Sequence, residues 1–77
     1  MTVKEFTRQS GIEYNEVLNA VFFSEIHKSG KNVNYPFEKL RSAVVEWLQI
    51  KERRAEHKLA NVRRDLVRAY AVESDEG

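Results

Sequence analysis

The chain has 77 residues, enough for one domain with a modest core, and its thirteen basic and twelve acidic side chains leave a net charge of only +1. Such a balance provides no overall field to attract nucleic acid, and the absence of cysteine excludes disulfides, thiolate metal sites and a cysteine nucleophile. No stretch reaches the roughly 18 apolar residues of a membrane span, and the N-terminus lacks the apolar segment of a secretory leader. We therefore expect a cytoplasmic protein with no membrane partner.

The first predicted helix spans residues 3–10. Thr2 and Glu5 have the spacing of a capping box, in which the threonine hydroxyl and the glutamate carboxylate satisfy free backbone amides at the helix start. Gly11 stands where a left-handed residue would close this helix, and Ile12 is placed for the apolar contact that accompanies such an ending. A tight turn into the next element should follow.

A second helix is predicted from Tyr14 to about Ser29–Gly30. Its apolar residues recur three and four positions apart, which places them on one face; they are Val17, Leu18, Val21, Phe22 and Ile26. Residues 31–34 form a polar connector. Pro36 suits the first turn of a third helix, with Asn34 or Tyr35 as its cap.

The third helix carries a strong amphipathic stripe after Pro36, formed by Phe37, Leu40, Val44, Trp47 and Leu48. The charged residues 51–54 interrupt this stripe before Ala55, Leu59, Val62, Leu66 and Ala69 resume it. Two arrangements are open. Either one helix of about 35 residues extends some 50 Å, which would require self-association, or the chain bends near residues 51–56 and folds a fourth helix back. The sequence thus predicts an all-α, three- to four-helix domain over residues 1–72, followed by a disordered acidic tail at 73–77.

The N-terminal hairpin, residues 3–22, carries a recognisable pattern. Phe6 is the inward residue of the first helix, Thr7 is small, Gly11 permits the reversal, and Ile12 and Val17 pack the two helices together. In these residues the segment resembles the helix-turn-helix of phage and plasmid regulators and excisionases. The resemblance implies that the second helix enters a major groove of double-stranded DNA.

The residues expected to contact DNA follow from that resemblance. Base and backbone contacts would come from Tyr14, Asn15 and Asn19 on the outer side of the second helix. Phosphates would be neutralised by Arg8, Lys28, Lys31, Arg53 and Arg54, the last two in a segment, 51–68, with seven basic and three acidic residues. Glu13 and Glu16 oppose this function, because carboxylates repel phosphates unless they accept from a cytosine amine.

A second hypothesis is a helical adaptor or inhibitor that binds a protein. Four apolar residues of the C-terminal helix would form a seam for a protein partner or for a second copy in a homodimer: Leu59, Val62, Leu66 and Ala69. An exposed aromatic patch is the other route to such a partner.

Catalysis is not expected. His27 and His57 are the only side chains that ordinarily titrate near neutral pH, and neither has the nucleophile and orienting carboxylate that acid–base chemistry needs. We expect no enzyme activity, no cofactor and no metal site.

Overall fold

The computed structural model describes residues 1–29, 33–54 and 59–73. Within them the chain forms four helices: α1 Val3–Ser10, α2 Tyr14–Phe23, α3 Phe37–Arg54 and α4 Leu59–Ala71. No strand occurs in these ranges, so the all-α prediction is confirmed. None of the described helices is both long and apolar enough to cross a membrane.

The first helix begins and ends where the sequence predicted. The Thr2 hydroxyl accepts a hydrogen bond from the Glu5 amide at 3.1 Å and donates one to the Glu5 carboxylate at 3.3 Å. Gly11 ends the helix in the left-handed region, with φ at 76°, and its amide donates to the Thr7 carbonyl at 2.9 Å. This residue turns the chain so that Ile12, only 1% exposed, enters the core.

Ser10 shows how a polar residue is accommodated inside this turn. Its side chain is buried, and its hydroxyl accepts a hydrogen bond from the Ile12 amide at 3.1 Å. An unpaired buried amide would cost free energy, and the serine removes that cost just where the backbone leaves its helical pattern.

The second helix is shorter than predicted, because it ends at Phe23 rather than near residue 29. Glu25 adopts a positive φ of 59° and breaks the helical path. Ile26 still packs against the core, as the periodicity indicated, but it does so from a turn. The Lys28 amide, which a longer helix would have paired with a backbone carbonyl, donates instead to the Tyr35 hydroxyl at 3.2 Å.

The chain before α3 is fastened to the N-terminus. The Tyr35 amide donates to the Met1 carbonyl at 2.9 Å, and the Met1 amino group donates to the Tyr35 carbonyl at 3.0 Å. The Pro36 carbonyl accepts the first helical bond, from Leu40, so Pro36 holds the cap position that was predicted for Asn34 or Tyr35.

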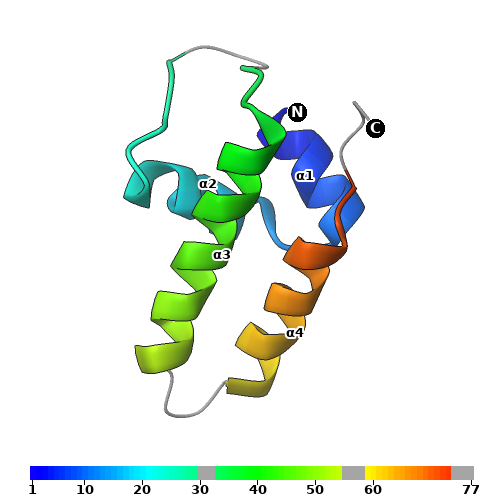
Figure 1. Ribbon diagram of the computed structural model, residues 1–77, viewed down its shortest axis with the longest axis vertical. Helices are drawn as coiled ribbons and strands as arrows, with labels where there is room; N and C mark the ends of the chain where they lie inside the picture. Colours follow the sequence, from blue (N-terminus) through cyan, green and yellow to red (C-terminus); the bar gives the residue numbers. More distant parts are fainter. Residues whose placement is uncertain (30–32, 55–58, 74–77) are drawn as a thin grey trace.

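The question of a long or bent C-terminal helix is resolved in favour of the bend. α3 ends at Arg54, and α4 begins at Leu59 and runs back along it, as Figure 1 shows. α2 crosses α3, and α1 lies against the far end of α4. All four helices contribute to one core, whose largest fully buried side chains are Phe6, Ile12, Val17, Val21, Leu40, Val44 and Leu48.

Candidate nucleic-acid interface

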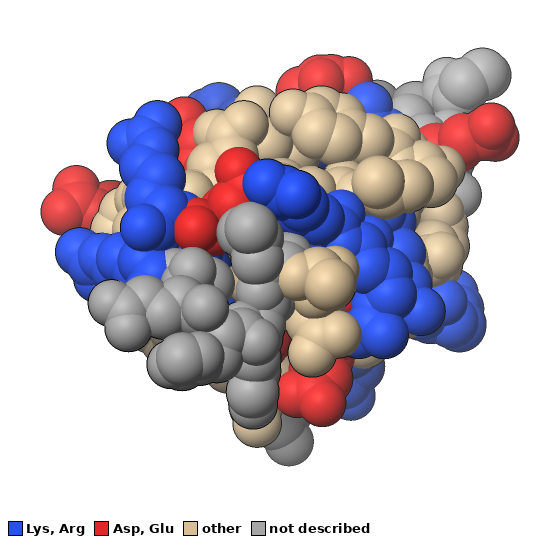
Figure 2. All heavy atoms as spheres, turned by 90° about the horizontal axis from the view of Figure 1, so that it is seen from below, with Lys and Arg blue, Asp and Glu red and all other residues tan. Residues whose placement is uncertain are grey.

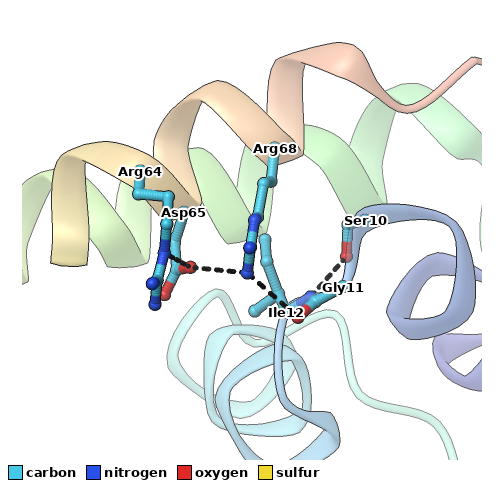
Figure 3. A network of polar contacts seen from close by, with 6 residues as sticks. All are labelled: Ser10, Gly11, Ile12, Arg64, Asp65 and Arg68. Carbon is cyan, nitrogen blue, oxygen red and sulfur yellow. Dashed lines mark hydrogen bonds and ion pairs between the residues drawn. The ribbon is translucent and has the colours of Figure 1, made fainter.

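A side chain of α4 contacts the turn between α1 and α2. An Arg68 guanidinium nitrogen lies 3.4 Å from the Gly11 carbonyl oxygen and 3.8 Å from the Asp65 carboxylate. Arg64 approaches the same carboxylate at 3.8 Å, so two arginines share one acidic group beside the turn (Figure 3). The C-terminal helix therefore helps fix the angle at which α2 leaves α1.

One side of α2 is left uncovered. Val17, Ala20 and Val21 face the core, whereas Asn15, Asn19 and Phe22 are exposed. The exposed three are spaced four and three residues apart and so form a single stripe along the helix. Tyr14, 43% exposed, lies beside its N-terminal end. Each of the three residues predicted for base or backbone contact is thus accessible.

Glu16 does not lie on this stripe, although the sequence placed it among the outward residues. Its carboxylate accepts hydrogen bonds from the Trp47 indole at 3.0 Å and from the Lys51 ammonium at 2.8 Å. Partial burial acts to raise the pKa of Glu16, but these two hydrogen bonds and the charge of Lys51 outweigh it, and the net pKa is lowered from 4.5. The carboxylate is therefore ionised at neutral pH and paired within the chain.

This pairing weakens one objection to DNA binding. Of the two carboxylates that opposed it, Glu16 is neutralised by Lys51, and only Glu13, exposed at the start of α2, stays free of an ion pair among the described residues. Repulsion from phosphates at this surface is correspondingly smaller than the sequence suggested.

Exposed cations lie on both helices that contact α2. On α3, Lys51 lies four residues after Trp47 and Arg54 lies three residues after Lys51, so the three side chains share one side of the helix. Trp47 and Lys51 donate hydrogen bonds to Glu16 of α2. Arg54 therefore lies about one turn beyond Lys51 on the side of α3 that meets α2. On α1, Lys4 and Arg8 are exposed one turn apart on the side opposite the buried Phe6. Figure 2 shows Lys and Arg side chains on both sides of the end where α3 stops and α4 starts.

The other cations predicted to contact phosphates differ in where they lie relative to α2. Arg53 is exposed but lies away from the side of α3 that meets α2, and Lys28 is exposed in the turn after α2. Lys31 falls outside the described residues. Of the predicted cations, Arg8 lies on α1 and Arg54 on the side of α3 that meets α2, and both helices contact α2.

The predicted seam of α4 packs against the chain itself. Val62 and Ala69 are 6% and 0% exposed, and Leu66 is half-buried against the same core. Leu59 begins α4, but its side chain is not among those described. Because α4 folds back onto α3, this apolar stripe is covered by residues of the same molecule, and a partner helix could not reach it in this fold.

Three features of the surface had been missed from the sequence. The Glu16–Trp47–Lys51 bridge joins residues far apart in the chain, and nothing local indicated it. Lys4 could have been found from its four-residue spacing to Arg8. Phe22 was assigned to the core but is 54% exposed, because α2 crosses α3 at an angle that buries the opposite side.

No group of three His, Asp or Glu side chains in the described residues is arranged to hold a metal ion. The chain matches no protein-family model, and neither a curated protein nor a solved structure shows significant similarity to it.

Proposed function

We propose that this protein binds double-stranded DNA by placing the outer side of α2 in the major groove. It would act by occupying its site, as small regulators of phage and mobile elements do, in the cytoplasm and without catalysis. The observation that carries this proposal is the exposed stripe of α2, on which Asn15 and Asn19 stand free of partners among the described residues.

The geometry of the stripe suits the groove. A helix with its side chains is about 10–12 Å across, close to the roughly 12 Å width of the major groove of B-form DNA. An asparagine amide can donate to and accept from the edge of adenine at the same time. Two such amides one turn apart, on a helix that follows the Gly11 turn contacted by Arg68, would meet bases at a defined spacing.

The flanking cations supply the affinity in this proposal. Each neutralised phosphate releases counterions, so binding should weaken steeply as the salt concentration increases. The slope of log affinity against log salt concentration should be about −0.9 for each phosphate contacted. Lys4, Arg8 and Arg54 are exposed on the helices that contact α2 and carry no ion pair among the described residues.

Fluorescence anisotropy with a labelled duplex, measured from about 50 to 200 mM salt, tests the proposal. Arg8→Gln should weaken binding and reduce the salt slope by about 0.9. The matched control is Arg63→Gln, because Arg63 is an exposed arginine of α4 whose guanidinium lies 3.6 Å from the Glu52 carboxylate of α3. Failure of the wild-type protein to bind duplex DNA at the lowest salt would refute the proposal. Equal losses in the two variants would refute the assigned surface.

A second candidate is a protein contact through the outer side of α4. Val67 and Tyr70, 68% and 58% exposed, lie one turn apart there and are the largest apolar groups that the described part of α4 presents to solvent. A protein partner or a second copy of the chain would have to dock at these residues rather than at the buried stripe. Val67→Asp would then abolish that association and leave DNA binding unchanged.

A further inference from the structure

Phe22 occupies an unusual place on the exposed stripe of α2. It follows Asn15 and Asn19 on the same side of the helix, and more than half of its side chain is open to solvent. An aromatic side chain that is 54% exposed leaves much of its apolar surface in water, and burying that surface against a ligand would be favourable. A ligand that contacts the amides of Asn15 and Asn19 and extends further along α2 would also contact Phe22.

The ring of Phe22 is held in place. His27 stacks on it with ring centroids 4.0 Å apart and an interplanar angle of 19°. The imidazole therefore covers one face of the ring, while 54% of the side chain stays exposed. Phe23 differs, because its ring leans on Trp47 at the flank of α2, with centroids 5.5 Å apart.

We infer that Phe22 reads the 5-methyl group of thymine, so that the stripe Asn15–Asn19–Phe22 selects A·T base pairs in the major groove. This inference rests on the proposed function. The stripe spans about 10 Å at 1.5 Å per residue, which corresponds to about three base pairs. Asparagine pairs with the adenine edge, and the apolar group that the major groove offers beside it is the thymine methyl.

Duplex DNA fits this stripe better than an apolar protein surface does. Two of its three members are amides, which would lose their hydrogen bonds to water against an apolar partner. Both helices that contact α2 carry exposed cations, Lys4 and Arg8 on α1 and Arg54 on α3, and DNA phosphates are the groups that such cations would pair with.

The test compares two duplexes of the same alternating A·T sequence, one with thymine and one with deoxyuridine in every thymine position. The wild-type protein should bind the uracil duplex about fourfold more weakly for each methyl group that Phe22 covers. Phe22→Ala should bind both duplexes equally, with an affinity close to that of the wild type on the uracil duplex. Circular dichroism checks that this exposed position tolerates the change.

Phe23→Ala is the matched control and should keep the wild-type preference for thymine. Equal binding of the two duplexes by the wild-type protein would overturn the inference while leaving DNA binding intact. A preference that survives in Phe22→Ala would also overturn it. Absence of any DNA binding by the wild type would remove the proposed function and this inference together.

Discussion

Glu16 couples the exposed helix to the longest helix of the fold. Through a single carboxylate oxygen it accepts hydrogen bonds from both the Trp47 indole and the Lys51 ammonium, so the first turn of α2 is tied to the second half of α3. Side-chain exposure of 25% for Glu16 and 37% for Lys51 leaves the ion pair partly screened by water, which limits what the charge attraction alone contributes. The indole hydrogen bond adds a directional contact that a simple surface pair lacks.

Glu16→Gln should lower the free energy of unfolding by about 1 kcal/mol at neutral pH. Because the pKa of Glu16 is lowered in the folded state, its contribution is complete above the ordinary value of 4.5 and is lost as pH falls through the lower folded value. Urea unfolding followed by Trp47 fluorescence should therefore show the wild type and the variant converging in acid.

Glu46→Gln provides the control for this prediction. Glu46 neighbours Trp47 in sequence but is exposed and has no ion pair among the described residues, so its variant should track the wild type at every pH. A Glu16→Gln protein as stable as the wild type at neutral pH would show that the bridge does not contribute to stability.

The helices differ in how far the sequence could define them. α1 was predictable at both ends, because Thr2 and Gly11 act on neighbouring backbone groups. The end of α2 was not, since Glu25 takes a left-handed conformation that its residue type does not favour. It is accompanied by contacts of Ile26 with the core and of Lys28 with Tyr35, which depend on the tertiary fold.

The candidate surface was predictable only where it depends on residues close together in the sequence. The turn chemistry at Gly11 indicated α1 and α2, and their outward positions included Asn15 and Asn19. The sequence could not show which partner would cover the apolar side of α4, because another chain and α3 satisfy the same periodicity equally well. Only the packing of α4 on α3 distinguishes them.

Two valines of α4 test this packing at the level of the helix. Val62→Asp would bury a carboxylate in the core and should destabilise the protein by about 3 kcal/mol or more, enough to unfold much of a small domain. Val67→Asp on the opposite, 68% exposed side should change stability by no more than about 0.5 kcal/mol. Thermal unfolding by circular dichroism measures both; similar stabilities would contradict the orientation of α4.

At the scale of the whole molecule, a single chain closes its own core. The radius of gyration of 11.9 Å is close to the roughly 11.5 Å expected for a folded chain of this length. With α4 folded back, no second copy is needed to cover the apolar stripe of α3 and α4. The near-neutral total charge conceals an uneven surface, in which exposed cations lie on the helices that contact α2 while Glu16 is paired with Lys51.

The central claim, that α2 is the DNA-reading helix, is tested most directly by recording amide spectra of the ¹⁵N-labelled protein during titration with a short A·T-rich duplex. We predict that the side-chain amide signals of Asn15 and Asn19, with the backbone signals of Tyr14 and Phe22, shift most. Signals of Val67 and Tyr70 on the outer side of α4 should stay in place. Shifts confined to α4, or no shifts at all, would contradict the claim.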